Sequence, residues 1–211
     1  MLDKITVYTQ SSIHIKTDMN IYFDPFKMQD SPHDADIVFI THAHYDHFSP
    51  EDIAAVSHAE TVYVIPASMR PQLRALSIAE ERLIAMHPGE VTTVQGIVVE
   101  AVPAYNLDKP MHPKENGWLG YVVTVEGQRV YVCGDTDAIP EGAAVSCDIV
   151  LLPIGGTFTM DAEEAADFVA RMQPHTAIPT HYGSIVGNTE DGMRFLRLVE
   201  APVNVCLKLE F

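Results

Sequence analysis

Thr41-His42-Ala43-His44-Tyr45-Asp46-His47 is the most informative segment of this 211-residue chain. It places three imidazoles and one carboxylate within six consecutive positions, from His42 to His47. Neutral imidazole suits zinc and other borderline divalent metals, and a carboxylate adds charge compensation. A sharp turn lets neighbouring side chains converge, whereas the alternating geometry of a strand sends them to opposite faces. The segment therefore predicts a metal site that is built in a turn.

The flanking residues indicate where this turn lies in the fold. Residues 36–40 form an apolar run, typical of a buried strand, that leads directly into the His-rich segment. On the other side, Ser49-Pro50-Glu51-Asp52 is typical of a helix start, with a capping Ser, a Pro at the first helical position and acids in the first turn. The turn is therefore expected to join the end of a strand to the start of a helix.

Two other expected strands end in residues that can bind a metal. Val132-Cys133-Gly134-Asp135-Thr136 places Asp135 after an apolar run, and Ala177-Ile178-Pro179-Thr180-His181 places His181 after another. Taken alone, an Asp here is typical of a turn or a helix cap, and a single His of a surface or core position. Their repetition gives them weight, because ligands in sheet-based α/β folds collect at the carboxyl ends of strands.

The rest of the chain alternates short strands and helices without a linker. Its first forty residues are rich in β-forming runs, and Glu126-Gly127-Gln128 is typical of a hairpin turn. In the last third we expect strands at 148–154, 176–179 and 203–209, and helices at 161–172 and 189–198. These patterns predict a single α/β domain over residues 1–211.

The motif His-x-His-x-Asp-His, followed by Gly-Asp-Thr and a late His, is similar to that of the metallo-β-lactamase superfamily, and it spans most of the chain. Asp24-Pro25 and Pro179-Thr180-His181-Tyr182-Gly183 resemble its small bacterial hydrolase branch. That branch is related to ascorbate-6-phosphate lactonase and to phospholipase-D-type enzymes that act on N-acylphosphatidylethanolamine. The resemblance implies a four-layer αββα sandwich with a two-metal site on its rim. It is specific for the fold and the metals and says little about the substrate.

The resemblance also implies a set of metal ligands in this chain. The first metal is expected on His42 and His44, the second on Asp46, His47 and His181, with Asp135 bridging the two metals.

One ligand is missing from its usual place. The superfamily generally has a further His at the end of the strand represented here by Val102-Pro103-Ala104-Tyr105-Asn106, where this chain has Asn106. His112, on the loop that follows, is the nearest replacement, and otherwise it is an exposed loop residue. If neither residue binds, the first metal is held weakly and the site works with one metal.

Catalysis is expected to involve residues of the same turns. Asp46 would ligate a metal and hold or accept a proton during hydrolysis. The resemblance does not decide which group protonates the leaving group, and Tyr105, Tyr182 and His112 are the candidates.

A further group of residues is expected to support the site or the core. Asp24, Asp34 and Asp161 are candidates to accept hydrogen bonds from ligand imidazoles, although Asp161 opens a helix and is better interpreted as its cap. Trp118 and Tyr121 lie on one strand and are interpreted as core residues rather than as the lining of a pocket.

The composition limits the partners of this chain. Thirteen Lys and Arg against 29 Asp and Glu give a formal net charge of −16, which disfavours nucleic-acid binding and repels anionic membranes. Three separated cysteines without a CxxC pair predict thiols in a reducing compartment. No signal-peptide pattern or long apolar run is visible, so a cytoplasmic protein is expected. A homo-oligomer remains open.

These observations favour a metal-dependent hydrolase that cleaves an ester, lactone or phosphodiester bond of a small molecule. Zn2+ is expected, with two ions per chain, and Mn2+, Fe2+ and Ni2+ are alternatives because His/Asp sites accept them as well. Two other hypotheses stay open at this point. One is a nucleic-acid-processing nuclease of the same superfamily. The other is a non-catalytic metal-binding protein, which is an alternative because Asn106 stands where the superfamily generally has a His.

Overall fold

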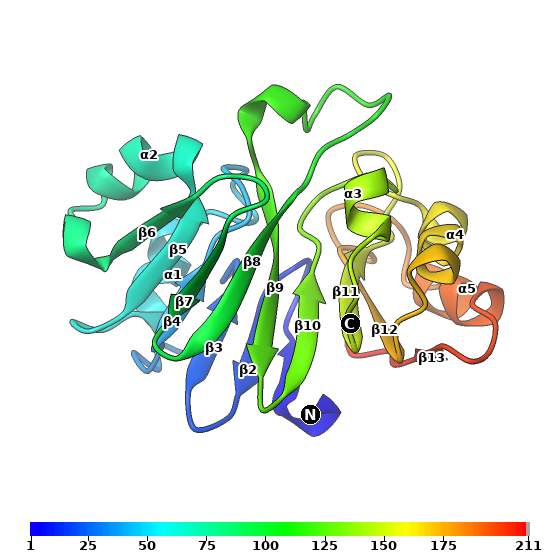
Figure 1. Ribbon diagram of the computed structural model, residues 1–211, viewed down its shortest axis with the longest axis horizontal. Coiled ribbons are helices and arrows are strands. Elements are labelled where there is room, and N and C mark those ends of the chain that lie inside the picture. Colours follow the sequence, from blue (N-terminus) through cyan, green and yellow to red (C-terminus); the bar gives the residue numbers. More distant parts are fainter. Residues whose placement is uncertain (210–211) are drawn as a thin grey trace.

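Two β-sheets form the centre of the molecule in the computed structural model, which describes residues 1–209 (Figure 1). The first sheet has the strand order β1-β2-β3-β4-β5-β6. Its first three strands are antiparallel, and β3 to β6 run parallel to one another. The strands are β1 (Ile5–Val7), β2 (Ile13–Lys16), β3 (Asn20–Phe23), β4 (Ile37–Phe39), β5 (Val62–Pro66) and β6 (Leu83–Met86).

The second sheet has the order β13-β12-β11-β10-β9-β8-β7. Strands β7 to β10 are antiparallel, whereas β10 to β13 are parallel. The strands are β7 (Val91–Val94), β8 (Ile97–Pro103), β9 (Leu119–Val125), β10 (Gln128–Val132), β11 (Ile149–Pro153), β12 (Thr176–Thr180) and β13 (Asn204–Val205). Each sheet therefore contains a parallel half, whose strands end at the same edge.

Helices cover the outer face of each sheet, which confirms the expected αββα sandwich (Figure 1). On the first sheet, α1 (Pro50–Val56) and α2 (Arg70–Ala75) bury Ile53 and Leu73 in a cluster with Val38 of β4. On the second sheet, α4 (Ala162–Met172) buries its apolar face, and α5 (Asp191–Leu198) packs beside it. The short helix α3 (Pro140–Ala143) lies against α4 and β8.

The main core lies between the two sheets, and the strand period of two residues assigns side chains to it. In β4, Ile37 and Phe39 face the second sheet, while Val38 faces the helices α1 and α2. Phe39 packs against Tyr121 of β9, with 5.1 Å between ring centroids. The Tyr121 hydroxyl donates a hydrogen bond of 2.9 Å to the carbonyl of Ile40, so its one polar group is satisfied in the core. Tyr121 is therefore a core residue, as predicted.

The short elements show where the sequence prediction holds and where the structure differs from it. The turn at Glu126-Gly127 joins β9 to β10 with positive φ at both residues, as a two-residue hairpin of type I′ requires. Strand β13, however, covers only Asn204 and Val205 of the run expected at 203–209. Helix α3 has four residues, too few for a periodic pattern, and was not predicted. Within residues 1–209, no helix is long and apolar enough to cross a membrane.

Candidate metal centre

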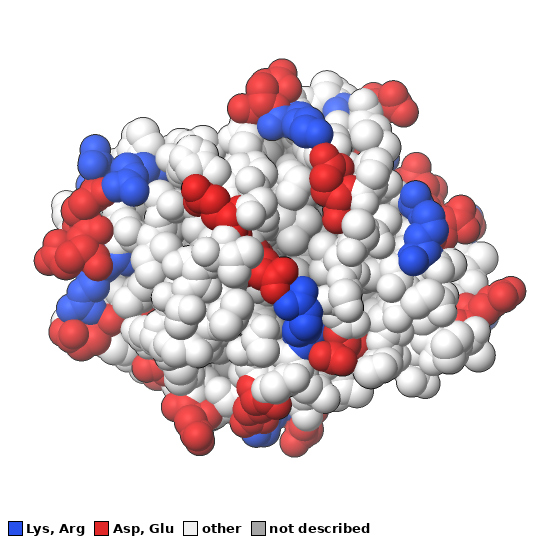
Figure 2. All heavy atoms as spheres, in the orientation of Figure 1, with Lys and Arg blue, Asp and Glu red and all other residues white. Residues whose placement is uncertain are grey.

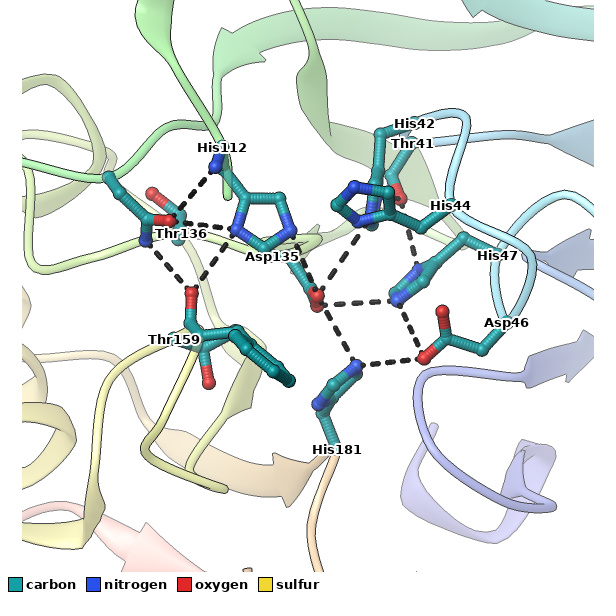
Figure 3. A network of polar contacts seen from close by, with 12 residues as sticks. Thr41, His42, His44, Asp46, His47, His112, Asp135, Thr136, Thr159 and His181 are labelled. Atoms are coloured by element: carbon teal, nitrogen blue, oxygen red, sulfur yellow. Dashed lines mark hydrogen bonds and ion pairs between the residues drawn. The ribbon is translucent and has the colours of Figure 1, made fainter. Parts of the chain in front are cut away.

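Four chain segments bring their side chains together at one edge of the sandwich (Figure 3). The His42–His47 turn follows β4 of the first sheet, as predicted from its flanking residues. Asp135 follows β10 and His181 follows β12, both in the second sheet. His112 comes from the loop between β8 and β9. The site therefore lies where the carboxyl ends of parallel strands from both sheets meet.

One cluster of possible ligand atoms consists of His42, His44, His112 and Asp135. Nε2 of His42 lies 3.0 Å from Nδ1 of His44. Oδ2 of Asp135 lies 3.3 Å from Nε2 of His112 and 3.8 Å from Nε2 of His42. These separations suit ligand atoms that share one ion, because two ligands at about 2.1 Å from a tetrahedral metal are roughly 3.4 Å apart.

A second cluster consists of Asp46, His47 and His181. Nε2 of His181 lies 3.3 Å from Oδ2 of Asp46 and 3.3 Å from Oδ2 of Asp135. Nε2 of His47 lies 3.4 Å from Oδ1 of Asp135. Asp135 thus borders both clusters, in the position that a bridging carboxylate needs. The structure thus brings the predicted ligand residues together, and their binding of metals stays a prediction.

Contacts on the far side of the imidazole rings determine which nitrogen faces the site. Nδ1 of His47 lies 2.7 Å from Oδ2 of Asp24, and Nδ1 of His42 lies 3.0 Å from Oγ1 of Thr41. The Thr41 hydroxyl in turn donates to Asp24 at 2.6 Å. A proton on each Nδ1 leaves the Nε2 lone pair directed into the site, which is the form that binds metals. Asp24 therefore has the supporting role that we predicted.

His112 is held in the same way, and its partner is Asn106. The Asn106 oxygen accepts hydrogen bonds from the backbone N–H of His112 at 3.1 Å and from its Nδ1 at 2.8 Å. The Asn106 amide donates to the carbonyl of Phe158 at 3.0 Å, and the same carbonyl lies 3.1 Å from Nδ1 of His112. Of the two replacements left open by the sequence, His112 thus faces the metal site and Asn106 lies behind it.

Several polar atoms of the site are buried without a hydrogen-bond partner. They include Nε2 of His47, Nε2 of His112 and Oδ1 of Asp135. Burying such atoms without a partner costs free energy, roughly 1–3 kcal/mol each. Divalent cations bound by the two clusters would satisfy all three atoms at once. The donor set, imidazole nitrogens with carboxylate oxygens, is the one that zinc and its neighbours accept. The residues therefore fit a two-metal centre.

The ionisation states of the residues also suit metal binding. Burial and the nearby His47 hold the pKa of His42 well below its ordinary value, so this ring is neutral at pH 7. Burial opposes a charge on His47, but the carboxylates of Asp135 and Asp24 outweigh it and hold the pKa of His47 well above its ordinary value. Burial alone would raise the pKa of Asp135, yet the surrounding imidazoles, His181 first, hold it well below its usual range. A metal at this site would therefore meet an ionised carboxylate at Asp135 and would compete with a proton for Nε2 of His47.

Other predicted residues contact groups outside the two clusters. The Tyr105 hydroxyl donates to Glu141 at 2.9 Å, and the Tyr182 ring is buried against Gly192 of α5. These positions do not favour either tyrosine as a proton donor to a substrate on the metals. Asp34 accepts a hydrogen bond from the Tyr22 hydroxyl rather than from an imidazole. Asp161 caps α4 in a capping box, as its alternative interpretation predicted.

Two residues enter the site that the sequence did not assign to it. Trp118, which we interpreted as a core residue, lies 4.9 Å from the rings of His42 and His44 and 5.7 Å from that of His112. It precedes β9, so the core pattern of that strand does not extend to it. Gln10, in the turn between β1 and β2, lies beside Asp46 and His181. A Gln in a polar turn matches no metal-binding pattern, so the sequence gives no sign of its role. Its complete burial is the structural feature that indicates a place in the site.

A family model of the beta-lactamase superfamily domain matches residues 11–182 of this chain. The chain belongs to the metallo-β-lactamase superfamily. Among its relatives in this superfamily, a metal-dependent hydrolase from Methanopyrus kandleri is 31% identical over 214 residues, covering 93% of this chain and 91% of that protein. One from Thermococcus kodakarensis is 30% identical, with 93% and 92% covered.

Solved structures are similar to this chain over nearly its whole length. A protein from Parabacteroides distasonis, named as a metal-dependent hydrolase, has a TM-score of 0.81 at 28% identity and covers 98% of this chain and 93% of its own. A metallo hydrolase from Ignicoccus hospitalis has a TM-score of 0.74 at 23% identity, with 98% and 95% covered, and shows the fold alone. The finer resemblance to ascorbate-6-phosphate lactonase and to phospholipase-D-type enzymes stays a prediction.

Proposed function

We propose that this protein is a metal-dependent hydrolase that cleaves an ester, lactone or phosphodiester bond of a small molecule with two divalent metals. The observation that carries the proposal is the pair of adjoining ligand clusters with Asp135 between them. The relatives that cover most of the chain are named as metal-dependent hydrolases, which supports the same activity. Zn2+ is the metal we propose first, because four imidazole and carboxylate ligands around an ion suit it.

The bound metals would supply a water of lowered pKa, about 7, and would stabilise negative charge as it develops. His42, His44, His112 and Asp135 would hold the first metal, and Asp46, His47, His181 and Asp135 the second. The contacts of Asp46 with its neighbours all involve Oδ2, which leaves Oδ1 to take up a proton. A hydrogen bond from His181 lowers the pKa of Asp46 against the effect of burial, so Asp46 is ionised at neutral pH and can accept that proton.

Asp46 is also our candidate for returning the proton to the leaving group. Neither Tyr105 nor Tyr182 has its hydroxyl among the metal ligands. His112 offers Nε2 to the first metal and engages Nδ1 with Asn106, so neither of its nitrogens remains for proton transfer. A single carboxylate that accepts a proton in one step and donates it in the next would close the cycle.

The surface favours a small substrate with an apolar part over a nucleic acid. Three exposed apolar side chains adjoin site residues in the sequence: Tyr45, Leu107 and Met111. A fourth, Ile185, lies beside the Gln10 side chain through its backbone N–H. On the face shown in Figure 2, Lys and Arg side chains lie beside acidic ones. Ion pairs of the molecule include Arg129–Glu100, Arg194–Glu163 and Lys114–Glu141. Cations that are already paired within a chain of net charge −16 contribute little to phosphate-backbone binding.

The experiment that tests this proposal compares wild type with His44→Ala. His44 supplies Nδ1 to the first cluster and is half-buried, so its loss should remove a metal with little effect on folding. We expect the metal content to fall from two per chain to about one. We also expect turnover of bis(p-nitrophenyl) phosphate, or of a generic lactone, to fall by several orders of magnitude. The matched control is His87→Ala, which removes an exposed His outside the site.

The alternatives predict other outcomes of the same panel. Cleavage of RNA with a steep salt dependence would support the nuclease hypothesis. Two bound metals without hydrolysis of any ester, lactone or phosphodiester would support a non-catalytic metal-binding protein. Full hydrolysis by a metal-free His44→Ala protein would refute the proposed mechanism.

A further inference from the structure

Gln10 is a fully buried polar residue that reaches the second metal cluster from outside the predicted ligand set. Its side-chain nitrogen lies 3.4 Å from Nε2 of His181 and 3.5 Å from Oδ2 of Asp46. Both of these atoms are ligand atoms of the second cluster. The end of the Gln10 carboxamide is therefore about as close to them as they are to each other, since Nε2 of His181 and Oδ2 of Asp46 are 3.3 Å apart.

These distances match ligand atoms around a shared ion better than direct hydrogen bonds. An N–H···O hydrogen bond is usually 2.9–3.0 Å long, and strength falls beyond about 3.2 Å. Ligand atoms at about 2.1 Å from one tetrahedral metal are roughly 3.4 Å apart, which is the spacing that Gln10 shows to both neighbours. The carboxamide thus lies at the spacing that a ligand of the second cluster would have.

The backbone of Gln10 is fixed so that the side chain stays in this position. Gln10 adopts a left-handed conformation, with φ of 49°, which is uncommon for a residue with a side chain. Its carbonyl accepts a hydrogen bond of 2.9 Å from the backbone N–H of His181, which is itself left-handed with φ of 55°. The turn between β1 and β2 is therefore attached directly to the residue that carries a metal ligand.

We propose that Gln10 is a further ligand of the second metal, through its side-chain oxygen. This inference rests on the two-metal centre proposed above. In the structure the carboxamide nitrogen lies beside Oδ2 of Asp46 and Nε2 of His181. With an ion bound to these two atoms, rotation of the carboxamide by half a turn about its last side-chain bond would direct its oxygen at the ion. This rotation costs little free energy, because the hydrogen bond that it breaks, between that oxygen and the backbone N–H of Ile185, is 3.5 Å long.

A Gln oxygen at this position would make the second site selective among metals. With His47, His181, Asp46 and Asp135 alone, the ion has four ligands, which satisfies tetrahedral Zn2+. A neutral carbonyl oxygen as a fifth ligand favours harder ions such as Mn2+, which prefer oxygen donors and higher coordination numbers. Gln10 should therefore matter more for Mn2+ than for Zn2+ at the second site.

The test measures stepwise metal binding to the full chain by calorimetry, with Mn2+ and with Zn2+, for wild type and Gln10→Leu. We expect the Kd of the second Mn2+ to rise on the order of 100-fold, and that of the second Zn2+ by less than about 10-fold. The first metal should bind unchanged. In the Co2+-loaded protein, visible absorption should become more intense, because the second site falls from five ligands to four.

Two further variants make the result decisive. Gln10→Asn keeps the amide but withdraws it by one methylene, so it should reproduce the loss, and it decides the question if Gln10→Leu does not fold. Ser12→Ala perturbs the same turn through its contact with the Phe26 N–H and should bind both metals as wild type does. Unchanged affinity for the second metal and an unchanged Co2+ spectrum in Gln10→Leu and Gln10→Asn would overturn the proposal that Gln10 is a ligand. Such a result would leave the proposed two-metal centre intact. A wild type that binds fewer than two metals would instead refute the two-metal centre itself.

Discussion

Removing the Asn106 side chain should weaken the first metal site without removing any metal ligand. In Asn106→Ala, His112 loses the hydrogen bond to its backbone N–H and one of the two acceptors of its Nδ1. The carbonyl of Phe158 still accepts from the ring at 3.1 Å, so the ring keeps a partner but loses its tether to the strand end. The expected change is a higher Kd for the first metal with the second metal little affected.

The size of the effect follows from the two hydrogen bonds that Asn106→Ala removes from His112. At about 1 kcal/mol each, these bonds amount to about 2 kcal/mol. At about 1.4 kcal/mol per factor of ten, the Kd of the first metal should rise about 30-fold. Residues that orient metal-binding imidazoles typically contribute about 10- to 100-fold to affinity, which includes this value.

The assay is competition of the protein with a chromophoric chelator for Zn2+, which resolves the two binding steps. Asn116→Ala is the matched control, because it makes the same chemical change on the same loop, outside the His112 contacts. Wild-type affinity for both metals in Asn106→Ala would refute the reasoning, since His112 would then be positioned without Asn106. An equal loss in Asn116→Ala would assign the effect to the loop as a whole.

Three other changes test the fold and the site. A chelator that strips the metals should lower the melting temperature, since metals at 100 times their Kd stabilise the native state by about 2.7 kcal/mol per site; equal melting curves with and without chelator would contradict bound metals. Lys109→Met, which breaks the ion pair with Asp137 beneath the His112 loop, should weaken the first metal only a few-fold, within about 1 kcal/mol, as measured by chelator competition. Gly120→Ala would place a Cβ 2.5 Å from the carbonyl oxygen of Cys133 and should cost about 3 kcal/mol or more in urea denaturation. Gly89→Ala, with open space around the new atom but a positive φ, should cost only about 1–2 kcal/mol and is its control.

Residue patterns predicted the parts of the site that lie at strand ends. The His42–His47 turn, Asp135 and His181 each follow an apolar strand, and parallel strands bring such ends to one edge. Asp24 was also predictable, because it ends the strand beside β4. For these residues, the local sequence and the order of the strands are enough to predict where each side chain lies.

The remaining parts depend on contacts between distant segments, which one sequence does not contain. The choice between His112 and Asn106 depends on how a fifteen-residue loop between β8 and β9 folds back on Phe158. Gln10 reaches the site only because the first sheet places its turn beside His181. Trp118 lies one position before a core strand, where the alternation that assigns buried residues has not yet begun.

The distribution of the ligands along the chain has a consequence for the order in which a ribosome can complete the two sites. All four side chains of the first cluster lie within residues 1–135, whereas the second cluster is complete only when His181 has been synthesised. The backbone N–H of His181 also donates to the carbonyl of Gln10, which lies 171 positions earlier in the chain. The turn that contains Gln10 must therefore remain without this partner until His181 has emerged from the ribosome. A second metal, as proposed above, would bind with full affinity only after His181 has emerged.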